Sequence, residues 1–111
     1  MAKKSQKSPF GHPFNEWRTS WINEGDRLIA EAEELLDDPT TTPHKSSHRS
    51  RYGRAARLYA KSARFYRQAG LGLMAQASYQ DAAECCSVLG DEQGCREYEG
   101  KANEIPEYWS E

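Results

Sequence analysis

The chain has 111 residues, of which 37% are hydrophobic and 29% charged, with a net charge of −2, and this suits one small globular domain with a modest core. No apolar run approaches the ~20 residues of a membrane-spanning helix, and no apolar stretch follows the lysine-rich N-terminus as it would in a secretory signal. The three cysteines are odd in number and lack the spacing of a zinc site, so we expect a reduced, cytoplasmic protein.

Charge is strongly segregated along the chain. Residues 1–10 and 39–80 contain Lys and Arg but no acidic residue, whereas residues 11–38 and 81–111 are rich in Asp and Glu. A basic middle between two acidic flanks predicts one of two arrangements. The charges either pair within the molecule, or the basic part forms a face that binds an acidic partner.

The N-terminal residues 1–12 are polar and predict a disordered basic tail in front of a single helical domain over 13–111. The first helix is expected over 15–37, with Asn15 as its N-cap. Gly25 interrupts the apolar side of this helix and marks a candidate kink. The apolar stripe, which we predict to pack in the core, consists of Trp17, Trp21, Leu28, Ala32 and Leu35.

A loop is predicted over 39–50, because this segment contains two prolines and no large apolar residue. Its length is at the upper end of ordinary connections, so we expect the loop to be either mobile or functional. His44 and His48 lie within it without a nearby Cys or acidic residue, and a metal site is therefore not expected.

The clearest element is a helix predicted over 51–69. Small and aromatic residues occupy one side of it, while Arg and Lys occupy the other. A second, narrower apolar edge at Leu58 and Phe65 predicts contact with two neighbouring helices. Gly70 and Gly72 are expected to end the helix and let the chain reverse. The basic side, called the basic stripe below, consists of Arg54, Arg57, Lys61, Arg64 and Arg67.

Two further helices are predicted, over 73–89 and 91–104. Gly90 is the expected C-terminal cap of the former, and Asp91 the expected N-cap of the latter. Their inward faces are expected to contain Ala75, Tyr79, Ala82 and Cys86 on the first helix and Cys95, Tyr98, Ala102 and Ile105 on the second.

Small and aromatic residues recur across the two middle helices at Tyr59, Ala63, Tyr66, Ala75, Tyr79 and Ala82. In this spacing the region over about 56–89 resembles one tetratricopeptide repeat. Ser62 and Ser87 depart from the family pattern, which usually has Leu and Pro there. The resemblance implies an all-α, four-helix array of antiparallel hairpins that binds protein. Because such arrays normally need about three repeats, it also implies that the chain binds a partner or self-associates.

The basic stripe and Trp109 are the predicted partner-binding residues. The stripe either docks an acidic surface or peptide of another protein, or it is a solvated face that pairs with the acidic helices. An alternative function is a nucleic-acid- or anion-binding accessory protein that uses the same stripe. An isoelectric point of about 5.9 and the lack of a nucleic-acid motif rank protein above nucleic acid as the partner. Trp109 is expected to fold back as a lid or to contact the partner.

No enzyme is predicted, because the chain lacks a nucleophile with a base, a set of metal ligands and a phosphate-binding loop. The segment from Gly70 to Gly72 is too short to cradle a phosphate and is explained by the turn. Cys86 and Cys95 are interpreted as small core residues. We therefore expect no catalytic residue, no metal and no cofactor.

Overall fold

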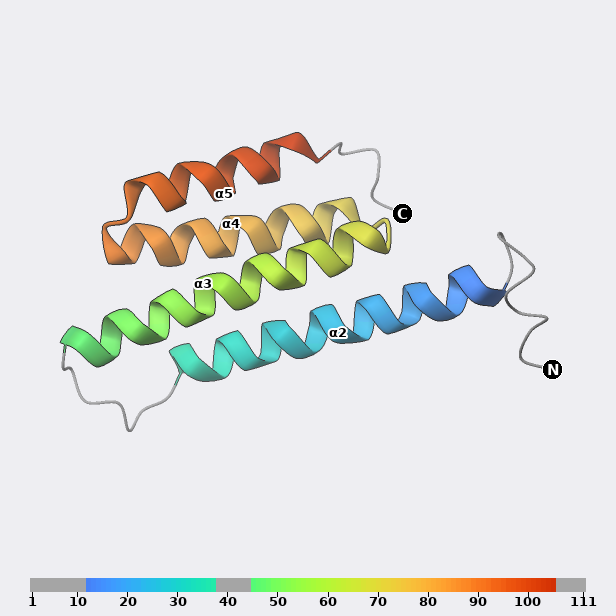
Figure 1. The fold of residues 1–111 in the computed structure, drawn as a ribbon, viewed down its shortest axis with the longest axis horizontal. Helices are drawn as coiled ribbons and strands as arrows, with labels where there is room; N and C mark the ends of the chain where they lie inside the picture. Colours follow the sequence, from blue (N-terminus) through green and yellow to red (C-terminus); the bar gives the residue numbers. More distant parts are fainter. Residues whose placement is uncertain (1–11, 38–44, 106–111) are drawn as a thin grey trace.

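The computed structural model describes residues 12–37 and 45–105, and throughout these two ranges the regular structure is helical, without a strand (Figure 1). The all-α class and the number of helices agree with the sequence-based prediction. The four helices are α2 (His12–Leu36), α3 (Lys45–Gln68), α4 (Gly72–Leu89) and α5 (Glu92–Glu104).

Each helix packs against its neighbours in chain order: α2 on α3, α3 on α4 and α4 on α5. Figure 1 shows the four helices side by side, with successive helices running in opposite directions. The Cα atoms span 54 × 29 × 17 Å, so the array is much thinner than it is wide. Tyr66 and Ala75 are buried at the α3–α4 hairpin, and α3 contacts two neighbours, as predicted.

Two helices begin earlier than predicted. Helix α2 starts at His12, so Asn15 lies inside it and is not the N-cap. Helix α3 starts at Lys45, so residues 45–50 of the predicted loop are helical. These residues lack an apolar pattern, and extending an existing helix is far easier than starting one. The rest of the predicted loop, 39–44, and the predicted tail up to residue 11 lie outside the described residues.

The C-terminal end of every described helix is bound by a side chain from a neighbouring helix. The last carbonyls of a helix lack partners within it, so such a donor satisfies them and fixes how the helices align. These hydrogen bonds run from Arg51 Nη1 to Leu35 O (2.9 Å), Arg18 Nε to Ala69 O (2.7 Å), Arg49 Nη1 to Leu89 O (3.4 Å) and Gln76 Nε2 to Ile105 O (2.7 Å).

The two tight turns follow the predicted caps. Gly70 and Gly90 have φ of 81° and 78°, in the left-handed region that favours glycine. The carboxylate of Asp91 accepts a hydrogen bond from the Gly94 N–H at 3.0 Å, which makes Asp91 the N-cap of α5. Gly72 differs from the prediction, because it is the first residue of α4 instead of part of the stop.

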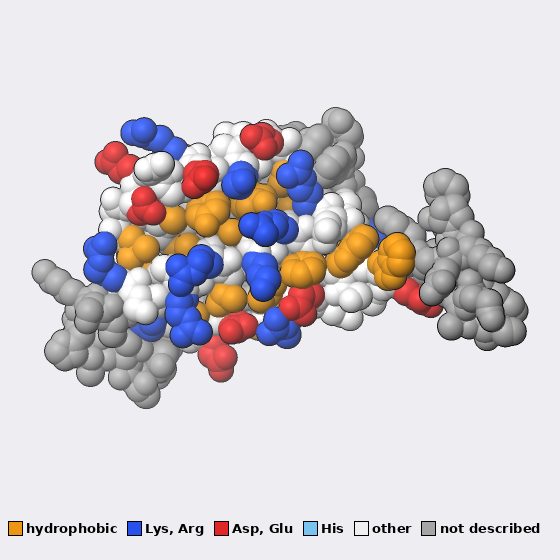
Figure 2. Space-filling view, viewed as in Figure 1, with side chains coloured by type: hydrophobic (Ala, Val, Ile, Leu, Met, Phe, Trp, Pro, Cys, Tyr) orange, Lys and Arg blue, Asp and Glu red, His pale blue; other side chains and the backbone are white. Residues whose placement is uncertain are grey.

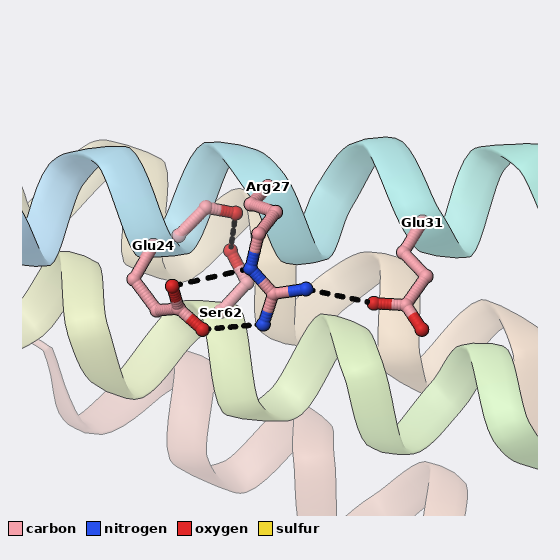
Figure 3. A network of polar contacts seen from close by, with 5 residues as sticks. Glu24, Arg27, Glu31 and Ser62 are labelled. Carbon is pink, nitrogen blue, oxygen red and sulfur yellow. Dashed lines mark hydrogen bonds and ion pairs between the residues drawn. The ribbon is translucent and has the colours of Figure 1, made fainter.

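Helix α3 packs tightly against α2 at Gly25, which is buried. A Cβ atom at this position would lie 2.8 Å from Cε1 of Tyr66. The fully buried Ser62 donates a hydrogen bond from Oγ to the Gly25 carbonyl at 2.8 Å, and Figure 3 shows it pointing from α3 toward α2. Helix α2 runs unbroken through Gly25. The glycine therefore serves a close approach, and Ser62 binds the backbone at the same position.

Candidate binding surface

The basic stripe lies on the exposed side of α3. All five of its side chains are exposed, whereas Ala55, Tyr59, Ser62, Ala63 and Tyr66 on the other sides of the helix are buried. Figure 2 shows Lys and Arg side chains gathered over the middle of one broad face, with hydrophobic side chains between them, along the line that α3 follows in the same view of Figure 1. We call this side of the array the basic face.

The ion pairs between described side chains lie within single acidic helices. In α2, Arg27 pairs with Glu24 and, at 3.3 Å, with Glu31 (Figure 3). In α5, Arg96 pairs with Glu92 at 3.7 Å. These pairs connect successive turns of the same helix and do not join the acidic helices to the basic stripe.

The positive potential of the stripe reaches both neighbouring acidic helices. The pKa of Glu24 on α2 is lowered, chiefly by its hydrogen bond from Arg27 and also by the charge of Lys61 on α3. On α5, burial raises the pKa of Tyr98, and two arginines of the stripe oppose this rise. The charges of the stripe therefore act on one residue of α2 and on one residue of α5.

A groove of about 410 Å³ opens beside the C-terminal half of the stripe. Most of its wall is apolar, and Phe65 is half-buried there, while the charged residues stand at its edge. The lining residues are Lys61, Arg64, Phe65, Arg67 and Gln68. The groove thus combines an apolar surface with several cationic donors.

Trp17 does not pack in the core as predicted: it is 56% exposed. Trp21 is half-buried against the core, and the two ring centroids lie 6.5 Å apart with an interplanar angle of 44°. The reason is the alignment of the two helices. Arg18 hydrogen bonds to Ala69 O, so Trp17 lies level with the end of α3, beyond which that helix offers no further surface to cover the ring.

A second groove has an acidic lining. Asp81, Glu84 and Glu99 line a groove of about 420 Å³ between α4 and α5. Burial raises the pKa of Asp81, and the charges of Glu84 and Glu33 raise it further. Burial also raises the pKa of Tyr59 on α3, to about 12, and the charges of Asp81 and Glu33 add to this rise.

The cysteines are packing residues. Cys85 and Cys86 are buried and Cys95 is half-buried, and all three are free thiols. Burial raises the pKa of Cys85 to about 11 and also raises that of Cys86. Because the thiolate is the reactive form, these values disfavour nucleophilic chemistry at neutral pH. The prediction of a core position holds for Cys86 and in part for Cys95.

Two other predicted features lie beyond what the structure describes. Trp109 and His44 fall outside the described residues, and the side chain of His48 is also not described. Among the side chains in 16–37 and 49–105, no three His, Cys, Asp or Glu residues are grouped as a metal site requires. No helix in the described part of the chain has both the length and the apolar character needed to cross a membrane.

Comparison with known proteins adds no relative. No protein-family model matches the chain, and neither the curated proteins nor the solved structures gave a match.

Proposed function

We propose that the chain is a small protein-interaction module that binds an acidic segment of a partner protein on its basic face. The observation that carries this proposal is the exposed basic stripe beside a mostly apolar groove on one side of a thin helical array. The Ala- and Tyr-rich packing of α3 on α4 supports a tetratricopeptide-like arrangement within this proposal.

The chemistry of the groove suits a peptide better than a nucleic acid. Guanidinium groups bind carboxylates in a two-pronged manner, and an apolar wall accommodates side chains between the charged groups. From Arg54 to Arg67 the stripe follows α3 for roughly 20 Å, a length that about six extended residues can follow. The Asp and Glu side chains that share this face with Lys and Arg (Figure 2) would repel a longer polyanion, which places nucleic acid second.

The test is binding of a fluorescein-labelled peptide that combines Glu with aromatic residues, measured by fluorescence anisotropy at low and high salt. Arg57→Glu with Arg64→Glu should weaken binding at least tenfold while the circular-dichroism spectrum stays helical. The matched control, Arg96→Glu with Lys101→Glu on α5, makes the same change in net charge at two other exposed positions. It should weaken binding much less.

Equal losses in the two double variants would show that only net charge matters, and would contradict the proposal. Tighter binding of a single-stranded oligonucleotide than of the peptide, with a steep salt dependence, would favour the nucleic-acid alternative.

A further inference from the structure

The groove on the basic face favours an occupant with particular chemical groups. Lys61, Arg64 and Arg67 place positive charge at its edge, and Phe65 is half-buried beside it. An occupant that satisfies both features carries carboxylates together with an aromatic side chain. A short segment suffices, because the groove is about 410 Å³ in volume.

The segment 106–111, which follows α5, has this composition. Its sequence is Pro-Glu-Tyr-Trp-Ser-Glu, with two acidic and two aromatic residues among six. Residues 39–80, from which the groove is built, contain no acidic residue at all. Segment and groove are therefore complementary in charge and in apolar character.

The segment also starts at the same end of the array as the groove. Ile105 is buried, and its carbonyl accepts a hydrogen bond from Gln76 on α4 at 2.7 Å. Because α4 runs back along α3 after the Gly70 turn, Gln76 lies about level with Phe65. The C-terminal ends of α3 and α5 lie at the same end of the array in Figure 1. Six extended residues span up to about 20 Å, enough to cross from α5 to the groove.

A second observation places α5 near the stripe. Arg64, which lines the groove, is close enough to Tyr98 on α5 to oppose the rise in its pKa that burial causes. The cations of α3 therefore act on the helix from which the segment continues.

We propose that residues 106–111 bind the groove of the basic face as an intramolecular ligand that a partner must displace. This inference rests on the proposed function, because it assigns a first occupant to the same groove. A short tether gives an effective concentration on the order of 1 mM. If the free peptide binds with a Kd of about 0.1 mM, the ratio of occupied to empty groove is about ten to one. The tethered segment then weakens the binding of an added peptide about tenfold.

The experiment uses the full chain and a fluorescein-labelled peptide with the sequence of residues 106–111, followed by fluorescence anisotropy. Glu107→Gln with Trp109→Ala weakens the tethered ligand and should lower the Kd of the added peptide about tenfold. The matched control is Glu97→Gln with Val88→Ala, which removes one exposed carboxylate and one exposed apolar side chain elsewhere. It should leave the Kd unchanged. Adding Lys61→Glu and Arg64→Glu to the 107/109 variant should abolish binding of the peptide.

Four results would overturn the inference. Equal peptide affinity for the wild-type chain and the 107/109 variant would show that the groove binds acidic peptides without a tethered occupant, and the proposed function would stand. Binding of the unrelated acidic peptide but not of the 106–111 peptide to that variant would reject this occupant alone, whereas binding of neither would reject both proposals. A dimer that the 107/109 substitutions dissociate in sedimentation velocity would assign the segment to a second copy.

Discussion

At the scale of single residues, a tight contact between α2 and α3 depends on the absence of a side chain. Gly25 lets the ring of Tyr66 lie against the backbone of α2, and Ser62 donates to the same backbone. The Tyr66 hydroxyl also donates to Asp26. Four positions, two on each helix, therefore share one interface, in which a methyl group added at Gly25 has no space.

Gly25→Ala should therefore destabilise the protein although alanine is the better helix former. Helix propensity favours Ala by about 1 kcal/mol, but overpacking against Tyr66 costs typically 1–3 kcal/mol. Gly53→Ala and Gly100→Ala are matched controls, because no described atom lies within 4 Å of a Cβ at either position. Thermal unfolding should show a lower Tm for the first variant and a raised Tm for the two controls. A Tm that rises equally in all three would mean that Tyr66 moves aside freely.

Two buried tyrosines also predict a loss of stability in alkali. Burial raises the pKa of Tyr59 to about 12, and burial together with the hydrogen bond to Asp26 raises that of Tyr66 to about 12, from an ordinary value of 10. Above pH 10 the unfolded chain releases these protons while the folded chain keeps them. Stability should therefore be fully present below pH 10 and be lost as the pH rises toward 12.

Denaturant unfolding measured between pH 9 and 12 would test this, with Tyr66→Phe as the comparison. Removing one of the two hydroxyls should flatten the decline, although Cys85, whose pKa is also raised, contributes from about pH 9 onward. An identical slope in the variant and the wild-type chain would show that Tyr66 does not contribute.

At the scale of the helices, local signals predicted some ends and tertiary contacts set the others. Helix α5 runs over Glu92–Glu104, almost as predicted, because Gly90 and Asp91 mark its beginning in the sequence itself. Helices α2 and α3 begin before the residues that the sequence predicts, because residues 12–14 and 45–50 have no apolar periodicity that would indicate a helix.

The same distinction applies to the candidate site. The exposure of the basic stripe follows from the helical period of one segment, and it was predicted. The groove and the exposure of Trp17 depend on how α2, α3 and α4 align along their axes. That alignment is set by hydrogen bonds between helices, such as Arg18 to Ala69 O, which leave no pattern in the sequence.

The importance of these bonds can be measured by comparing two arginines of α2. Arg18 donates from a partly buried position to Ala69 O at 2.7 Å, whereas Arg27 bonds to exposed carboxylates of its own helix. Methionine keeps much of the apolar stem while removing the donor. Arg18→Met should lower the free energy of unfolding by about 1.5–3 kcal/mol, and Arg27→Met should lower it by at most about 1 kcal/mol. If urea unfolding gave equal losses of stability for the two variants, the bond between the helices would contribute no more than the exposed pairs within α2.

At the scale of the whole molecule, stability is distributed along the chain. Helices α3 and α4 each pack on two neighbours, whereas α2 packs mainly on α3 and α5 mainly on α4. In such an array each interface adds nearly independently to stability, so the terminal helices should open at lower free energy than the central pair. The hairpin of α3 and α4, which we expect to be the most stable part, therefore carries the basic stripe.

Hydrogen exchange of two buried-alanine variants would show this distribution. Ala102 is 2% exposed where α5 meets α4, and Ala63 is fully buried in the central hairpin. Ala102→Gly lowers helix propensity by about 1 kcal/mol and should speed exchange in α5 while α3 and α4 stay protected. Ala63→Leu overpacks the centre, at a cost of about 1–3 kcal/mol, and should speed exchange in all four helices and lower the Tm. If Ala102→Gly also accelerated exchange throughout α3, the array would unfold as one unit, and the binding face could not stay folded while α5 opens.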